Sequence, residues 1–208
     1  MSTRRYTPKI RQTQVSERRE RVAAATAELH AEKGVIATSY AEIAQRAGVS
    51  LPTVHSYFPT QAALMSACTG HVAAGAPRLP VEAILAAPDL RNAAETLVAA
   101  VDGLHAYFEP WVSWRQETVV PFLAELMATR RAQLTALMLL LLTQYRGGPQ
   151  IVHAAVWEAI LSFDFWQRLV RQHGLPRVRV RATLNDLLMA ALGPEPSTPL
   201  QPGPRRRS

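Results

Sequence analysis

The stretch AEIAQRAGVSLPTVHSYFPTQ, at residues 41–61, constrains the fold of this chain more than any other part of its sequence. Two short runs of apolar residues at helical spacing meet at Gly48, and the second run stops at Pro59. A helix of two turns is not stable alone in water, so neighbouring helices must support both runs. Two helices joined by a glycine turn, with polar residues on the second, predict a helix-turn-helix that presents its second helix to a partner.

Residues that favour helix boundaries mark the ends of these two helices. Ser39 and Glu42 have the spacing of a capping box, which predicts the start of the first one. Gly48 can adopt a positive φ and therefore ends it. Ser50 is a good N-cap for the second helix, and Pro52 fits its first turn, where a missing N–H costs nothing.

The rest of the chain predicts helices only, because it has no strand-period runs and no Asn-Gly hairpin signals. Helices are expected at residues 15–33, from about 60, once briefly between 76 and 88, then at 89–108 up to a break at Pro110, 121–145, 151–173 and 179–192. A turn or short helix is expected at 111–117. The predicted fold class is all-α, with an N-terminal three-helix helix-turn-helix domain and a larger C-terminal helical domain. The predicted divisions are a flexible basic arm (1–14), the helix-turn-helix domain (15–75), the second domain (76–193) and a disordered, proline-rich tail (194–208).

Positive charge is concentrated at the two ends of the chain. The net charge is +7 over 208 residues, and residues 1–21 hold seven basic side chains against only Glu17 and Glu20. A localised basic end favours a polyanion such as nucleic acid, or an acidic membrane surface. A charged terminus with no role beyond solvation is the alternative.

The sequence gives no indication of secretion or of a membrane span. Cys68 is the only cysteine, so no intrachain disulfide can form. The first residues contain no apolar signal segment. The longest dense apolar run, Leu137–Leu142, is far shorter than the roughly 20 residues that cross a bilayer. A cytoplasmic protein with no membrane partner is expected.

Motifs of catalysis and metal binding are not found in the sequence. There is no Ser/His/Asp order, no phosphate-binding glycine loop, no paired carboxylates and no metal-ligand spacing around His105 or His153. We therefore expect no enzyme, no metal and no cofactor. Cys68 and His71 lie one turn apart, which permits a thiol sensor, although a lone buried cysteine more commonly acts as a small hydrophobic residue.

From Arg21 to Leu64 the sequence resembles the DNA-binding domain of the TetR family of bacterial transcriptional regulators. The matching residues are AAATAELHAEKG, followed by TS-x-x-x-IA-x-x-AGVS-x-x-TVH-x-YF-x-x-x-x-x-L. This pattern covers roughly a quarter of the chain and is highly specific at this spacing. The remaining helical part has the size and class found in such regulators but carries no motif of its own.

The resemblance implies DNA contacts around the second short helix. Leu51 and Thr53 would face base edges, and Leu51 can offer only apolar contact, for example to a thymine methyl group. Gln61 departs from the family pattern, which usually has a phosphate-pairing lysine there. The implied DNA-binding residues are Thr38 and Ser39 (to phosphate), Ser50, Leu51, Thr53, His55, Ser56, Tyr57 (the histidine and tyrosine as donors) and Gln61. Basic residues of the arm, Arg4, Arg5, Lys9 and Arg11, can supply the missing charge, including from the minor groove.

The resemblance also implies a homodimer built from the last two long helices, which pack as a four-helix bundle. Two-fold symmetry would place the two recognition helices about 34 Å apart, opposite a palindromic operator. The expected interface residues are Val156, Ile160, Phe163, Trp166, Leu184, Leu187 and Leu188. Their periodicity alone says only that they are buried.

Aromatic residues near the expected helix break suggest a site for a small effector. The predicted ligand-binding residues are Tyr107, Phe108, Trp111, Trp114, Arg115, Phe122, Met127, His153 and Trp157, with Glu117 as a further polar residue. An aromatic-rich core is the alternative.

Taken together, the sequence predicts a DNA-binding transcriptional regulator, a homodimeric repressor released from a palindromic operator by a small-molecule effector. A regulator that responds to a protein partner, or to nothing, is the second interpretation, and a helical enzyme is the third.

Overall fold

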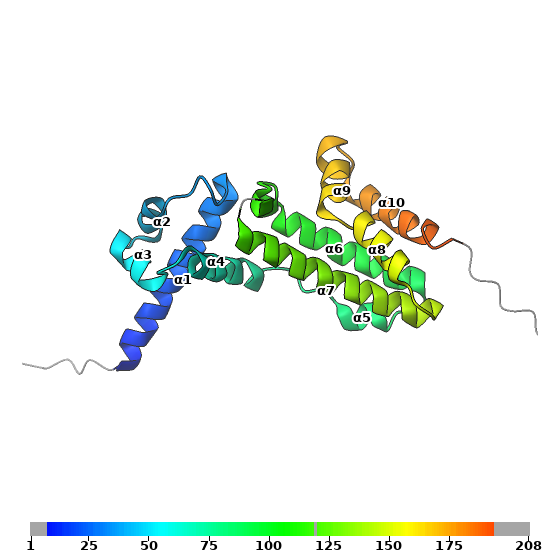
Figure 1. Cartoon of the computed structure of the whole chain (residues 1–208), viewed down its shortest axis with the longest axis horizontal. Helices are drawn as coiled ribbons and strands as arrows, with labels where there is room; N and C mark the ends of the chain where they lie inside the picture. The colour runs from blue at the N-terminus through cyan, green and yellow to red at the C-terminus, as the bar shows by residue number, and fades with distance from the viewer. Residues whose placement is uncertain (1–7, 119, 194–208) are drawn as a thin grey trace, which may run out of the picture. The chain divides into compact units, whose positions relative to one another are not determined.

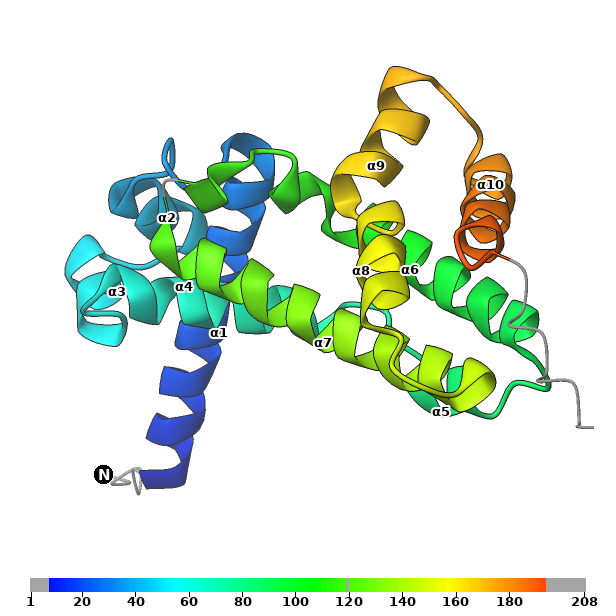
Figure 2. The same cartoon turned by 45° about the vertical axis from the view of Figure 1, so that its right-hand side comes forward.

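A computed structural model describes residues 8–118 and 120–193 of the chain (Figures 1 and 2). These residues contain helices and no strands, which confirms the predicted all-α class. The α-helices are α1 (Pro8–Lys33), α2 (Tyr40–Ala47), α3 (Leu51–Tyr57), α4 (Gln61–Ala74), α5 (Val81–Leu85), α6 (Leu90–Val112), α7 (Pro121–Arg146), α8 (Ile151–Ile160), α9 (Phe163–Gln167) and α10 (Arg177–Ala190). A short 3-10 helix, η1, covers Gln116–Thr118, and a π-helical turn, η2, covers Arg168–Gln172. No helix in this part of the chain combines the length and apolar character needed to span a membrane.

The first helix begins earlier than the sequence predicted. It starts at Pro8 rather than near Val15, so residues 8–14 of the predicted basic arm are helical. The arm's residues 1–7 and the predicted disordered tail at 194–208 lie outside the described residues.

Pro110 does not end the sixth helix, and the predicted break there is wrong. Helix α6 continues to Val112, and the N–H of Ser113 still donates to the carbonyl of Glu109 at 3.1 Å. Pro110 lacks an N–H donor and crowds the preceding turn, but at an exposed position in the last turn this does not stop the helix.

The prediction of a single long helix at residues 151–173 is also wrong. The chain breaks at Ser162, whose extended backbone (φ −64°, ψ 150°) starts α9. Its hydroxyl accepts a hydrogen bond from the N–H of Phe165 at 3.3 Å, as an N-cap does. This serine stands inside an apolar periodic run, which concealed the start signal.

The described chain divides into two compact units. Among the described residues, the first comprises residues 8–79, 100–118 and 120–132, and the second comprises residues 80–99 and 133–193. Helices α6 and α7 each supply residues to both units. The domain division expected at residue 75/76 stays a prediction.

In the first unit, α1 to α4 surround one small apolar core (Figure 1). Helix α3 is held there by Val54 and Phe58, whose side chains are fully buried. The other buried members of this core are Val22, Ala25, Leu29, Ile43, Ala44, Ala47 and Leu64. The two-turn helices are thus supported by the longer α1 and α4, as the sequence predicted.

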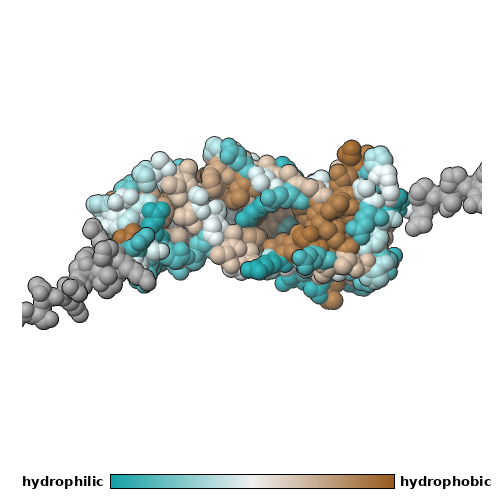
Figure 3. Space-filling model, turned by 90° about the horizontal axis from the view of Figure 1, so that it is seen from below, coloured by the Kyte–Doolittle hydropathy of each residue, from teal (hydrophilic) through white to brown (hydrophobic). Residues whose placement is uncertain are grey.

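In the second unit, the core is centred on two tryptophans. Trp157 and Trp166 are buried, and the indole N–H of Trp157 donates to the carbonyl of Leu188 at 3.0 Å. Apolar residues also remain exposed in this unit, and in the space-filling view brown side chains gather over its part of the chain, on the right (Figure 3).

Candidate nucleic-acid interface and effector pocket

Local backbone bonds set the turn between α2 and α3. Gly48 has φ +65°, in the left-handed region, and its N–H donates to the carbonyl of Gln45. The N–H of Val49 donates to Ala44 at 3.0 Å. Ser50 then caps α3 by accepting a hydrogen bond from the N–H of Thr53. The turn and both caps lie where the sequence predicted them.

The side chains facing outward from α3 include most of the predicted DNA-reading residues. Leu51, His55 and Ser56 are exposed, while Thr53 and Tyr57 are half-buried. Gln61 is exposed at the start of α4. This surface offers one apolar side chain, hydroxyl groups and an imidazole, which are groups that can reach base edges and phosphates.

His55 does not project freely from α3. Its ring stacks on that of Tyr40, with centroids 4.8 Å apart and an interplanar angle of 4°. Burial raises the pKa of Tyr40, so its hydroxyl stays protonated at neutral pH. The stack fixes the imidazole before DNA arrives, which lowers the entropy cost of a contact. The sequence did not identify Tyr40, because nothing in its spacing pairs it with His55.

Hydroxyl groups at the start of α3 are paired with each other. The Oγ of Ser50 lies 2.7 Å from the Oγ1 of Thr53, and one of the two hydroxyls donates to the other. One O–H donor therefore remains available at this end of the helix. Thr53 is thus positioned by its own N-cap.

At the start of α2, the side chains that are predicted to contact phosphate already form hydrogen bonds within the protein. Thr38 donates its hydroxyl to Gly34 at 2.7 Å and its N–H to Val35. Ser39 donates both its N–H and its hydroxyl to Glu42. A hydrogen bond from Lys33, then bonds from Ser39, lower the pKa of Glu42 to about 2, so this carboxylate remains charged. Phosphate contacts through the side chains of Thr38 and Ser39 stay a prediction that requires these donors to be released.

Two arginines that the sequence analysis did not single out brace the DNA-binding helices. Arg19 of α1 donates to the carbonyl of Tyr57 at 3.0 Å, and its guanidinium lies 4.8 Å from the ring centroid of Phe58. Cations favour the C-terminal end of a helix, so this contact supports the end of α3. Arg46 of α2 pairs with Glu28 and Glu32 of α1. Both contacts join residues far apart in the sequence, and no local pattern predicts them.

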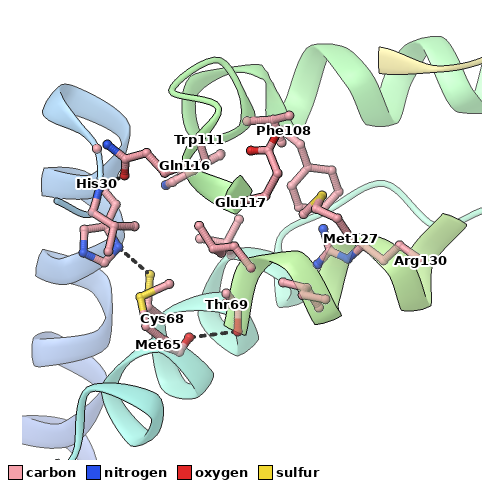
Figure 4. A pocket seen from close by; sticks show the side chains of 16 residues that line it. His30, Met65, Cys68, Thr69, Phe108, Trp111, Gln116, Glu117, Met127 and Arg130 are labelled. Carbon is pink, nitrogen blue, oxygen red and sulfur yellow. Dashed lines mark hydrogen bonds between the residues drawn. The ribbon is translucent and has the colours of Figure 1, made fainter. Parts of the chain in front are cut away.

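A pocket in the first unit lies beside α1 and α4, the helices that support α2 and α3 (Figure 4). The space in and in front of it is about 660 Å³, a volume that includes open solvent. Phe108, Trp111 and Met127, three of the predicted ligand residues, line it, and so does Glu117, the further polar residue named from the sequence. The other lining residues are His30, Gly34, Val35, Met65, Cys68, Thr69, Val72, Val112, Gln116, Leu123, Leu126 and Arg130.

Six predicted ligand residues do not line this pocket. In the first unit, Tyr107 donates its hydroxyl to Val72, and Trp114 donates its indole N–H to Ala31. In the second unit, Trp157 is buried in the core. The remaining three are Arg115, an exposed residue with φ +50°, Phe122, which is half-buried, and His153, which lies 2.8 Å from the side-chain oxygen of Gln150. Aromatic composition alone did not separate pocket residues from residues that anchor neighbouring segments.

The pocket wall is hydrogen-bonded to α1. Trp111 donates its indole N–H to the carbonyl of Ala27 at 2.8 Å. The side-chain oxygen of Gln116 accepts from the N–H groups of Val35, at 2.6 Å, and Ile36, at 3.3 Å, just beyond the end of α1. These bonds connect the residues that would touch a ligand to the helix that packs on α2.

At one end of the pocket, His30 and Cys68 form a buried polar pair. The Nδ1 of His30 lies 3.6 Å from the Sγ of Cys68 (Figure 4). Burial lowers the pKa of His30 to about 4 and raises that of the Cys68 thiol to about 12. Both side chains are therefore neutral at pH 7. A protonated thiol is a poor nucleophile, which favours a packing role for Cys68 over a thiol sensor.

The predicted dimer residues fall into two groups within the second unit. Trp166, Leu184 and Leu188 are buried in the unit's own core and are not accessible to a partner in this structure. Val156 and Leu187 are 39% and 38% exposed, and Ile160 and Phe163 are half-buried. Further exposed apolar residues that the prediction did not include are Ile151, Val152 and Val178.

Comparison with known families decides the identity of the N-terminal helices. Residues 22–68 match the sequence model of the bacterial regulatory proteins of the tetR family. Residues 22–68 are therefore similar to the DNA-binding domain of the tetR family. This match covers the helix-turn-helix and the adjoining parts of α1 and α4, and it confirms the resemblance noted in the sequence. No curated protein matches the chain.

Solved structures share the fold of this chain over most of its length. NalD of Pseudomonas aeruginosa, the secondary repressor of the MexAB-OprM multidrug efflux pump, is 20% identical with a TM-score of 0.63, over 85% of this chain and 95% of NalD. A transcriptional regulator from Rhodococcus sp. Rha1 is 21% identical with a TM-score of 0.59, over 84% of this chain and 95% of that one. The multidrug binding protein EbrR, solved with imidazole, is 21% identical with a TM-score of 0.55, over 95% and 96%.

The family match places a tetR-type DNA-binding domain at residues 22–68. Among the described residues, no group of three or more His, Cys, Asp or Glu side chains is arranged to hold a metal ion.

Proposed function

We propose that this chain is a TetR-family transcriptional regulator, a homodimeric repressor that leaves a palindromic operator when a small molecule binds the pocket of the first unit. The observation that supports the effector response is the position of the pocket. Its wall contains residues of α1 and α4, the two helices that hold α2 and α3 in place. A ligand there would contact the supports of the DNA-reading helix directly.

The proposed coupling runs through the bonds between the pocket wall and α1. Trp111 and Gln116 line the pocket and also hold Ala27 and Val35 by hydrogen bonds. A ligand that displaces either side chain would shift or loosen these bonds. A ligand that favours the released state a hundredfold changes the operator equilibrium by about 2.7 kcal/mol, which is enough to derepress a balanced promoter.

The proposed dimer uses the exposed apolar side chains of α8 and α10. Val156 and Leu187 are available on these helices. Burying large apolar side chains of this kind on association contributes roughly 1.5–3 kcal/mol each when burial is complete. A dimer of this kind would present two copies of α3 to successive turns of DNA. The proposed location is the cytoplasm, where a regulator reaches its operator.

The alternative function is a DNA-binding regulator without a small-molecule ligand, responsive to a protein partner or constitutive. The largely apolar lining of the pocket would then be part of a loosely packed core. Operator binding that ignores every compound held in the pocket would favour this alternative.

Selection of bound DNA from random sequence, followed by binding titrations, tests the proposal. Thr53→Ala should weaken binding to the selected operator at least about tenfold if Thr53 forms a base contact. Thr143→Ala is the matched control, because Thr143 is an exposed helical threonine of the second unit. Equal affinities for wild type and Thr53→Ala, or a selected site without two-fold symmetry, would contradict the proposed mode of binding.

A further inference from the structure

Arg130 is the positively charged side chain of the pocket. It comes from α7, and its guanidinium carbon lies 4.6 Å from the ring centroid of Phe108. Figure 4 shows its guanidinium group turned toward the pocket, beside Met127 and Phe108. The residue is half-buried, and burial lowers its pKa from the ordinary arginine value. It remains charged at neutral pH, because an arginine is not deprotonated in proteins.

No acceptor in the described part of the chain satisfies this cation. Arg130 takes part in none of the hydrogen bonds or ion pairs formed among residues 8–118 and 120–193, and its contact is the aromatic ring of Phe108. A guanidinium group has five N–H donors in a planar fork that fits a carboxylate with two parallel bonds. Partial burial of a cation without an anion is unfavourable, so an anionic ligand would find a prepared site.

The remainder of the pocket is suited to an apolar body. Leu123, Leu126 and Met127 of α7 lie on the same helix as Arg130, and Trp111 faces them from α6. At the far end, His30 and Cys68 are neutral at pH 7, as described above. A ligand that reaches from Arg130 into this space would bury hydrocarbon or an aromatic ring.

Glu117, from η1, is the carboxylate of the pocket and restricts the number of anionic groups that a ligand can carry. A second carboxylate on the ligand would meet like charge there. A hydrophobic cation, which Glu117 could attract, is disfavoured by Arg130 and finds one face of Phe108 already covered by the guanidinium.

We propose that the pocket binds an amphipathic monocarboxylate, with its carboxylate paired to Arg130 and its apolar body held between α7, Trp111 and the His30–Cys68 end. The proposal deepens the proposed effector response and rests on it for its biological meaning. The binding chemistry itself is measured without DNA.

The test uses four probes with the full-length chain and follows binding by calorimetry and tryptophan fluorescence. The probes are phenylbutyrate, its neutral amide phenylbutanamide, the dicarboxylate phenylglutarate and the cation tetraphenylphosphonium. Wild type should bind phenylbutyrate most tightly. Arg130→Gln should weaken phenylbutyrate at least about tenfold while changing the amide by less than about twofold, because only the anion uses the charge. Arg130→Lys should retain part of the affinity, and Arg131→Gln, at an exposed neighbour, should leave it unchanged.

Several results would overturn the proposal. These are equal binding of the acid and the amide, tighter binding of tetraphenylphosphonium that Glu117→Gln abolishes, or no saturable binding of phenylbutyrate. If Arg130→Gln does not fold, as judged by circular dichroism, the comparison of acid with amide on wild type and Arg130→Lys decides the matter. Phenylbutyrate that binds as predicted but leaves operator affinity unchanged would contradict the proposed function and not this inference.

Discussion

The helix-turn-helix and the pocket belong to the same compact unit, yet the residues that form them are distributed very differently along the chain. Both ends of α2 and the start of α3 are set by residues within four positions of them, namely Ser39, Glu42, Gly48 and Ser50. The pocket takes its walls from segments between His30 and Arg130. The first region can therefore be recognised from a short stretch of sequence, whereas the second exists only after the chain has folded.

The difference also concerns what each region does with polar groups. In the helix-turn-helix, caps and ion pairs satisfy most donors close to where they arise, as with Ser39 and Glu42. In the pocket, Arg130 has no acceptor among the described residues, while Trp111 and Gln116 bond to a distant helix. A region that only needs to be rigid satisfies its polar groups internally, while a region that receives a ligand can leave a charge available.

The largest expected effect is on the core of the helix-turn-helix. Phe58→Ala should lower the free energy of unfolding by about 3–5 kcal/mol, because a fully buried ring leaves a cavity. Urea unfolding of the full chain measures this loss. Leu51→Ala, at a 40% exposed position on α3, should change stability by less than about 1 kcal/mol and instead reduce operator affinity. Equal losses of stability for Phe58→Ala and Leu51→Ala would contradict the assignment of Phe58 to the core and of Leu51 to the DNA-reading surface.

Acid should destabilise the protein through His30 in the pocket. The pKa of this histidine falls from 6.5 to about 4 on folding, so between these values the unfolded chain binds a proton that the folded chain does not. Stability therefore decreases as the pH falls through this window, by up to about 1.4 kcal/mol per pH unit from this group. Unfolding of His30→Gln should show a flatter pH dependence between pH 6.5 and 4, and a constant offset from wild type above pH 7. An unchanged slope would show that His30 titrates normally in the folded protein.

The bond between the pocket wall and α1 should contribute a smaller amount. Trp111→Phe removes the N–H that donates to Ala27 and should cost about 1–2 kcal/mol, from one hydrogen bond and lost volume. Trp114→Phe removes a similar bond, to Ala31, at an exposed position and should cost less than about 0.5 kcal/mol. Urea unfolding of the two variants compares the two losses of stability directly. A larger loss for Trp114→Phe would show that the bond from Trp114, and not the one from Trp111, holds this segment to α1.

The smallest effect should come from the cap of α2. Ser39→Ala should cost about 1 kcal/mol, because it removes one half of the capping box. Ser66→Ala, in the exposed interior of α4, should change stability by less than about 0.5 kcal/mol. Thermal unfolding with both variants tests whether the boundary signal is as local as the sequence suggests. A larger loss for Ser66→Ala would contradict this.

The same contrast explains what the sequence could and could not predict. The capping box at Ser39 and the positive φ of Gly48 follow from short-range chemistry, and the structure confirms both. Ser162 obeys the same chemistry but stands inside an apolar run, so the break between α8 and α9 was missed. Pro110 was given too much weight, because near the end of a helix the loss of one N–H is tolerated.

In the pocket, composition identified aromatic residues but not their roles. Phe108 and Trp111 line the cavity, whereas Tyr107 and Trp114 in the same helix and turn anchor other segments. Arg130 was not predicted, because a lone arginine on an amphipathic helix usually faces solvent. Only the fold shows that it meets Phe108 without an acidic partner in the described part of the chain.

The central claim is that occupation of the pocket and binding of DNA are coupled through α1 and α4. The most direct test measures the affinity of a ligand that quenches tryptophan fluorescence in the pocket, once with the free protein and once with saturating selected operator. Coupling is reciprocal, so a ligand that releases DNA must bind more weakly, by the same factor, when DNA is present. A ligand affinity about fivefold or more lower on the operator complex would support the account. Equal affinities in the two states would contradict it.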